Sequence, residues 1–89
     1  MKDIPHLATA FAQILYEARR QARFSQAGLA REVGCARSFV SFLETAEHLP
    51  SLNAFLVLSR ALGISSVDML SRLESRLAAL SAQSIDDEH

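Results

Sequence analysis

The sequence feature that most constrains the fold is a pair of short amphipathic segments hinged at one glycine. Apolar residues recur at helical spacing within residues 26–33 and again within residues 37–46. Ser25 is placed to cap the first segment, and Gly34 follows it where a left-handed backbone conformation can end a helix at no steric cost. Two helices joined by so tight a turn pack at a steep angle, which pushes the second one outward.

The rest of the chain has the same helical character. The hydrophobic pattern predicts a first helix over residues 6–22 and a fifth over about residues 66–82. Pro50 breaks the pattern after the second short segment, Ser51 caps a fourth helix, and Gly63 stops it. We see no strand alternation, internal repeat or low-complexity segment. The fold class is therefore predicted to be all-α, with five helices joined by short loops.

A chain of 89 residues has room for one domain. We expect this domain to span residues 1–82, followed by an acidic tail over residues 83–89. The longest strictly apolar run, Ala54 to Leu58, is too short to cross a bilayer, and the N-terminus does not read as a secretory signal. The single cysteine excludes an internal disulfide framework and fits a reducing compartment. These features predict a cytoplasmic protein with no membrane partner.

The formal net charge of −1 hides an uneven distribution. Between residues 19 and 37 five arginines face a single acid, Glu32, whereas Asp86, Asp87 and Glu88 gather in the tail. A polyanion responds to the local field within a Debye length of about 8–10 Å, so a basic cluster can attract nucleic acid whatever the net charge. Arginines on solvated helix faces are the alternative. The five are Arg19, Arg20, Arg23, Arg31 and Arg37.

The sequence resembles the Cro/CI-like (XRE-type) helix-turn-helix family of phage repressors and bacterial transcriptional regulators. The resemblance covers roughly residues 11–70. It implies a lambda-repressor-like fold, here with an extended C-terminal helix, that binds double-stranded DNA with the second short helix in the major groove. The matching positions are Arg19, Ser25-Gln26, Leu29-Ala30, Gly34, Ser38, Val40-Ser41, Leu43-Glu44, Pro50-Ser51-Leu52 and Ala61-Leu62-Gly63-Ile64.

The resemblance also implies roles for residues outside the recognition helix. Gln26 matches a residue that contacts a DNA phosphate and braces the recognition helix. Arg19 and Glu44 match a salt-bridged pair that joins the first and third helices. Further phosphate contacts are expected from Arg31, from Ser51 and from the N–H groups at the start of the fourth helix.

Base-edge contacts are implied for five residues at and after the start of the recognition helix. Arg37 is the strongest candidate, because its guanidinium can donate to both acceptors of a guanine. A phosphate contact by Arg37 is the alternative. The five positions that match base-reading residues are Ala36, Arg37, Ser38, Ser41 and Phe42.

Four positions depart from the family pattern. Ala36 stands where a capping Ser or Thr is usual, and losing such a cap costs about 0.5–2 kcal/mol. Arg23 and Ala46 replace the glycines that usually follow the first and third helices. Phe42 replaces a polar or basic residue, and it is expected either to contact thymine methyl groups or to anchor a protein partner.

Leucines continue beyond the matched region at coiled-coil spacing, at Leu70, Leu73, Leu77 and Leu80. Part of this seam must cover the first helix. We expect Leu77 and Leu80 to extend past the edge of that core and to form, with Leu73, the interface of a homodimer. Two copies would present recognition helices to the half-sites of an inverted-repeat operator, about 34 Å apart.

The leading functional hypothesis is a sequence-specific transcriptional regulator that acts as a repressor. The alternative is a protein-interaction module or an antitoxin on the same fold, with a regulatory protein as its main partner. We expect no enzyme activity, cofactor or small-molecule ligand, because no phosphate-binding loop, carboxylate pair or activated nucleophile is visible. His6, His48 and His89 show no metal-ligand spacing, and Cys35 is interpreted as a small apolar filler.

Overall fold

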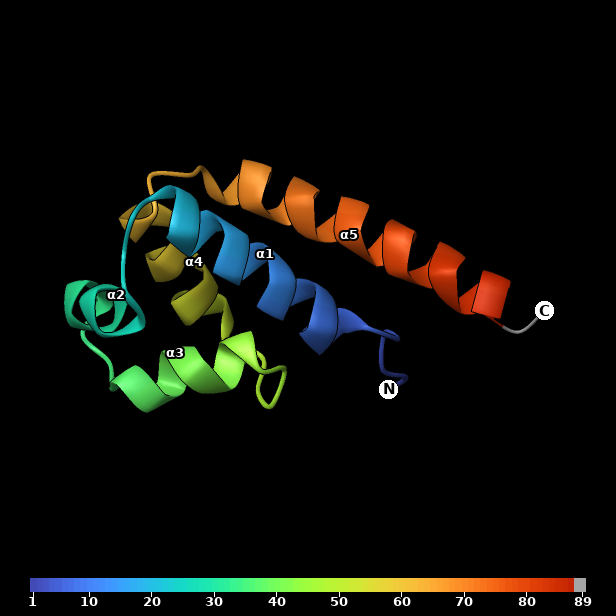
Figure 1. The fold of residues 1–89 in the computed structure, drawn as a ribbon, viewed down its shortest axis with the longest axis horizontal. Helices are drawn as coiled ribbons and strands as arrows, with labels where there is room; N and C mark the ends of the chain where they lie inside the picture. Colours follow the sequence, from blue (N-terminus) through green and yellow to red (C-terminus); the bar gives the residue numbers. More distant parts are fainter. Residues whose placement is uncertain (88–89) are drawn as a thin grey trace.

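The computed structural model describes the backbone of residues 1–87 and the side chains of residues 1–83. Within that part the chain forms five helices and no strand, which confirms the predicted fold class (Figure 1). The helices are α1 (Leu7–Gln21), α2 (Gln26–Val33), α3 (Arg37–Glu44), α4 (Leu52–Ala61) and α5 (Ser66–Asp87).

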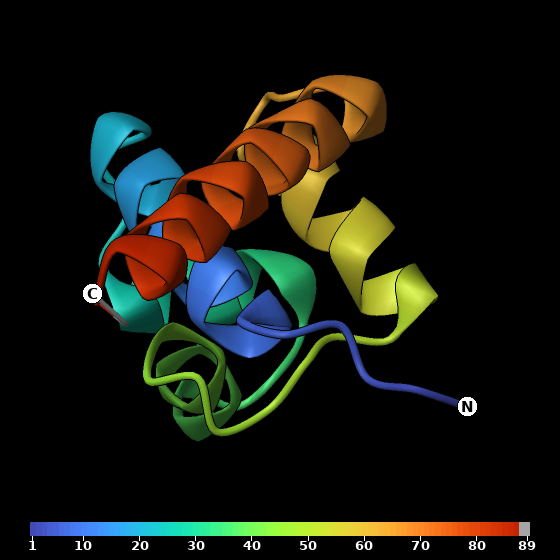
Figure 2. The same cartoon turned by 90° about the vertical axis from the view of Figure 1, so that its right-hand side faces the viewer.

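Helix α1 lies at the centre of the arrangement. It packs against α3 on one side and against α5 on the other, while α4 contacts both α2 and α5. Figures 1 and 2 show α5 running along α1, opposite α3. All five helices contribute to the single core, so none is an appendage. The largest fully buried side chains are Phe11, Leu15, Leu29, Val40, Leu43, Leu58, Ser59 and Met69.

Local signals in the sequence set the starts of three helices. The hydroxyls of Ser25, Ser51 and Ser65 each accept a hydrogen bond from the backbone N–H three residues later, at 2.9–3.0 Å. Each bond satisfies one of the N–H groups that a helix start leaves without an intrahelical partner. Gly34 and Gly63 have φ of 79° and 72°, the left-handed conformation that ends a helix most easily at glycine. The predicted caps at Ser25 and Ser51 and the stops at both glycines are confirmed.

Two predicted helix ends are wrong. Helix α3 ends at Glu44 and not at residue 46, because Ala46 adopts a left-handed conformation with φ 62°. Helix α5 continues to Asp87 instead of ending near residue 82, since no glycine or proline follows Gly63 to break it. The backbone of the expected tail is therefore helical through Asp87, and its acidic side chains lie outside the described residues.

The expectation that Leu77 and Leu80 extend past the core is also wrong. Leu73 is 9% exposed and belongs to the core, and Leu77 and Leu80 are partly buried against it. The reason is the packing of α5 against α1. Because of this packing, the core extends further along α5 than the leucine spacing suggests. Leu70 is the exposed member of the seam, at 50%.

Candidate nucleic-acid interface

The turn between α2 and α3 is closed by backbone hydrogen bonds. The N–H groups of Gly34 and Cys35 both donate to the carbonyl oxygen of Ala30, at 2.9 Å each. Ala30 itself is 3% exposed, and its small side chain lets the two helices approach closely. The turn directs α3 away from α2 along the lower surface of the molecule in Figure 1.

Helix α3 is buried on one side and exposed on the other. Val40 and Leu43 are fully buried, which fixes the rotation of the helix about its axis. The five positions that match base-reading residues then lie at or toward the surface: Ser41 is half-buried, and Ala36, Arg37, Ser38 and Phe42 are exposed. The start of α3 carries no side-chain cap, as the Ala36 departure predicts. The exposed side of α3 therefore presents a guanidinium, small hydroxyls and an aromatic ring to a binding partner.

A buried ion pair holds α3 against α1. Arg19 donates from Nε and Nη2 to the two carboxylate oxygens of Glu44, at 2.6 and 2.9 Å, and from Nη1 to the carbonyl of Phe24 at 2.8 Å. The Arg19 and Glu44 side chains are 7% and 4% exposed. The hydrogen bond to Glu44 raises the pKa of Arg19 above its ordinary value although burial opposes it, so the guanidinium stays charged.

Gln26 extends this pair to α2. Its side-chain amide donates to the Glu44 carboxylate at 3.1 Å, so the first residue of α2 touches the last residue of α3. Three helices thus meet at the Glu44 carboxylate. We call Arg19, Gln26 and Glu44 together the inner cluster. The inner cluster sets how far α3 stands out from α1 and α2.

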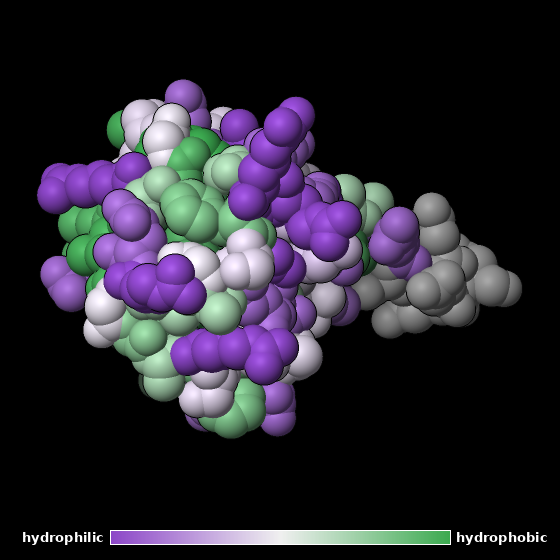
Figure 3. Space-filling model, turned by 60° about the vertical axis from the view of Figure 1, so that its left-hand side comes forward, coloured by the Kyte–Doolittle hydropathy of each residue, from purple (hydrophilic) through white to green (hydrophobic). Residues whose placement is uncertain are grey.

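An open groove of about 610 Å³ lies beside the N-terminus of α2. The N–H groups at a helix start carry a partial positive charge, and the arginines around them add full charges. In the view of Figure 3, hydrophilic side chains project between apolar ones on the surface that comes forward. The positive charge around the groove suits a phosphate group. The polar residues that line the groove include Arg19, Arg20, Arg23, Gln26 and Arg37.

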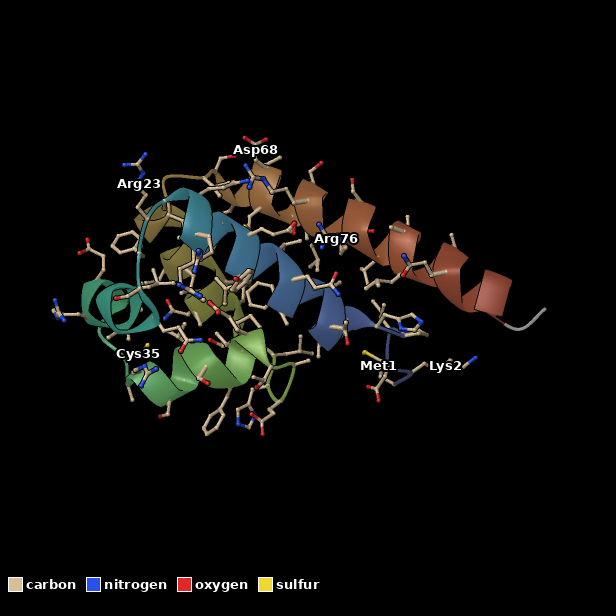
Figure 4. The ribbon with its side chains drawn as sticks, viewed as in Figure 1. Met1, Lys2, Arg23, Cys35, Asp68 and Arg76 are labelled. Atoms are coloured by element: carbon tan, nitrogen blue, oxygen red, sulfur yellow. The ribbon has the colours of Figure 1, made fainter. Side chains whose placement is uncertain are left out.

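The family resemblance implied no DNA contact for Arg20 or Arg23, although both line the groove. Arg20 lies over the ring of Tyr16, with its guanidinium carbon 5.8 Å from the ring centroid, and Arg23 points away from the body of the molecule (Figure 4). The cluster of arginines was visible in the sequence. Their position around the α2 N-terminus was not, because it depends on the left-handed turn at Arg23 that follows α1.

The two remaining candidates for phosphate contact do not line this groove. Arg31 is exposed on α2, and Ser51 is exposed at the start of α4, where its hydroxyl accepts from the N–H of Ala54. The first turn of α4 lies near the start of α3, since Asn53 and Ala54 share a small cavity with Cys35 and Phe39. The start of α4 therefore places backbone N–H groups near the start of α3.

The described residues give little support for a metal site, a reactive cysteine or a membrane-spanning helix. No group of three His, Cys, Asp or Glu side chains in this part of the chain could hold a metal ion. Burial raises the pKa of the Cys35 thiol, which disfavours the reactive thiolate. No single described helix is long and apolar enough to cross a membrane, and α4 with the first part of α5 meets that test only as a pair bent by 107°.

Comparison with known proteins agrees with this geometry. Residues 10–73 match the family described as a helix-turn-helix domain, and the chain belongs to that family, of the XRE type. Its fold is that of helix-turn-helix DNA-binding transcriptional regulators, which are not enzymes. Among proteins of curated function, no sequence matches this chain.

Two solved structures show how widely the fold is shared. The clp gene regulator ClgR from Corynebacterium glutamicum superposes with a TM-score of 0.87 at 23% identity, over 97% of this chain and 92% of that chain. An R46A mutant of the restriction-modification controller protein C.Esp1396I superposes with a TM-score of 0.75 at 17% identity, over 81% of this chain and 96% of that chain.

Proposed function

We propose that this protein is a sequence-specific repressor of transcription that acts in the cytoplasm and binds an inverted-repeat operator as a homodimer. The observation that carries the proposal is the outward side of α3, which the inner cluster holds rigidly beside a groove lined by arginines. A rigid helix with exposed polar side chains can enter the major groove, where the four base pairs are distinguishable.

The proposal divides the work between two sets of residues. Arg37 reads a guanine, with Ala36, Ser38, Ser41 and Phe42 facing neighbouring base edges. The phosphate backbone is held by Gln26, Arg31 and Ser51, to which the structure leads us to add Arg20 and Arg23, because both line the groove at the α2 N-terminus. Phosphate contacts give affinity and position, and base contacts give sequence preference.

Titration of purified protein on the DNA upstream of its own gene, at several salt concentrations, tests the proposal. If a dimer neutralises about 6–8 phosphates, log K falls with log salt at a slope of about −5 to −7. Arg23→Ala should reduce the slope by about one per contact removed, whereas Arg60→Ala, which removes an exposed arginine outside the groove, should not. Absence of binding at low salt overturns the proposal and favours a protein-interaction module.

Base reading and positioning can be separated by two variants. Arg37→Ala should cost about 1–3 kcal/mol on the preferred site and relax the preference at one base pair per half-site. Gln26→Ala should weaken binding to all sequences about equally. The reverse pattern would mean that α3 is not the reading helix.

For the homodimer, the exposure of the leucines supports a different interface from the one expected from the sequence. Leu73, Leu77 and Leu80 pack in or against the core of one copy, whereas Leu49, Leu52 and Leu70 are 48%, 77% and 50% exposed. These last three line one apolar groove of about 330 Å³, the dimer surface, between α1, α4 and α5. A second copy related by a two-fold axis would cover it and supply the second recognition helix that an inverted repeat requires.

Oligomeric state tests this part of the proposal. Leu52→Lys with Leu70→Lys should leave the domain folded but monomeric in sedimentation, with much weaker operator binding because two half-sites no longer act together. Leu77→Lys is the matched control: it should destabilise the monomer itself, since this leucine packs against the core. A dimer that survives the double change places the interface elsewhere.

A further inference from the structure

Phe42 is the one large apolar side chain on the exposed side of α3 within the described residues, and it is 39% exposed. Its neighbours one helical turn earlier and one residue earlier are Ser38 and Ser41. The exposed part of the ring gains nothing for the fold, because only burial of apolar surface is favourable. The ring is therefore available for a contact that the isolated chain does not make.

The ring is nevertheless held in place. His48 meets it edge-on, with ring centroids 5.2 Å apart and an interplanar angle of 82°. The loop that carries His48 turns back onto the end of α3: the N–H groups of Glu47 and His48 both donate to the carbonyl of Phe42, at 2.9 and 3.3 Å. The left-handed conformation of Ala46 makes this turn possible. A fixed ring can read a shape, which a mobile ring cannot.

The surroundings of Phe42 favour a base edge over a protein surface. A protein-docking site needs a contiguous apolar patch of several hundred Å². The exposed Leu49, Leu52 and Leu70 line an apolar groove between α1, α4 and α5, and Phe42 does not line it. The major-groove edges of base pairs offer one apolar group of the size of a single contact, the C5-methyl of thymine.

We propose that Phe42 is a specificity-determining residue that reads the C5-methyl group of a pyrimidine in each operator half-site, and that His48 is its positioning residue. This inference rests on the proposed function. Arg37 and Phe42 are five residues apart on α3, a rise of about 7.5 Å along the helix axis. The methylated pyrimidine should therefore belong to a different base pair from the one that Arg37 reads.

Replacement of thymine by deoxyuridine tests the inference, because it removes the methyl group and keeps the base pairing. The operator is first selected from random duplexes with the full chain, and each thymine is then replaced in turn. One thymine per half-site should be sensitive, with about a fourfold loss of affinity per half-site, the effect of one buried methyl-sized group. All other thymines should be insensitive.

Variants connect the sensitive thymine to the two rings. Phe42→Ala should bind the thymine and deoxyuridine operators equally, while Ser38→Ala, on the same side of α3, should keep the fourfold ratio at that position. His48→Ala should reduce the ratio without lowering the thermal midpoint of unfolding, and His48→Phe should restore it. Phe42→Gln, which keeps a long side chain but makes its end polar, replaces the alanine variant if the latter does not fold.

The outcomes separate this inference from the proposed function. Tight binding to a selected operator with no deoxyuridine-sensitive thymine overturns the role of Phe42 and leaves the DNA-binding function standing. A sensitive thymine whose ratio survives Phe42→Ala, or Phe42→Gln in its place, also overturns it. Failure to select any DNA sequence overturns the inference and the function together.

Discussion

Two arginine clusters anchor α1 to its neighbours, and they differ most in their access to water. In the inner cluster Arg19 binds Glu44, and Gln26 donates to the same carboxylate. In a second, outer cluster between α1 and α5, Arg76 donates to both oxygens of Glu17 at 2.6 and 2.7 Å and to the side-chain oxygen of Gln13 at 2.8 Å. Figure 4 shows Arg76 between the two helices.

The two clusters are similar in charge, although Arg19 binds the two oxygens of Glu44 with two nitrogens and Arg76 binds both oxygens of Glu17 with Nη2 alone. The hydrogen bond to its carboxylate raises the pKa of Arg19 and of Arg76 alike. Burial does distinguish them: the side chains of the outer pair are 31% and 43% exposed, against 7% and 4% in the inner pair. Water can replace a lost partner in the outer cluster and cannot in the inner one. We infer that the inner cluster fixes the recognition helix, while the outer one only adds to a helix contact made by apolar packing.

The largest expected effect comes from breaking the inner cluster. Glu44→Ala leaves the Arg19 guanidinium buried without its carboxylate and should lower the free energy of unfolding by about 3–5 kcal/mol. Urea denaturation followed by circular dichroism measures the loss. The double change Arg19→Met with Glu44→Leu removes both charges and should cost less than Glu44→Ala alone. A loss below about 1 kcal/mol for the single variant would place the inner pair in the same class as the outer one.

A smaller effect comes from the starts of the two helices that the clusters attach to α1. Helix α5 begins with the Ser65 cap, whereas α3 begins at Ala36 without one. Ala36→Ser should raise the free energy of unfolding by about 1 kcal/mol, and Ser65→Ala should lower it by about the same amount. Thermal unfolding of both variants gives the comparison. No gain from Ala36→Ser would mean that the inner cluster already holds the first turn of α3.

The turns that follow α1 and α3 should give an effect of similar or smaller size. Arg23 and Ala46 have φ of 62°, a conformation that costs a residue with a Cβ roughly 1–2 kcal/mol. Glycine removes this strain, but it loses part of the gain because its unfolded chain has more conformational entropy. Arg23→Gly and Ala46→Gly should therefore each raise the free energy of unfolding by about 0.5–1 kcal/mol. Gly34→Ala, the reverse change at φ 79°, should lower it. The same denaturation assay checks all three.

The smallest effect should come from the outer cluster. Glu17→Gln keeps the shape of the side chain and removes its charge, and should cost about 0.2–1 kcal/mol at low salt. Raising the salt concentration should shrink this cost, because exposed charges are screened over about a Debye length. Denaturation curves at two ionic strengths measure both quantities. A cost that equals that of Glu44→Ala would remove the contrast between the two clusters.

The sequence determined the parts of this protein that depend on neighbours a few residues away. The serine caps, the glycine stops and the helical periodicity are local preferences of the backbone, so Ser25, Gly34 and Gly63 could be assigned before the structure was known. The extended pattern of the helix-turn-helix family added the pairing of Arg19 with Glu44.

Which surfaces are covered depends on how the helices pack together. The leucines of α5 follow one heptad pattern, yet Leu73 is buried and Leu70 is exposed, because α1 packs against only one side of α5. Likewise, Arg20 and Arg23 line a groove with Gln26 only because the chain reverses between α1 and α2. Periodicity defines the apolar side of a helix, but burial and the meeting of distant charges depend on which helices pack together and over what length, and this is a property of the whole fold.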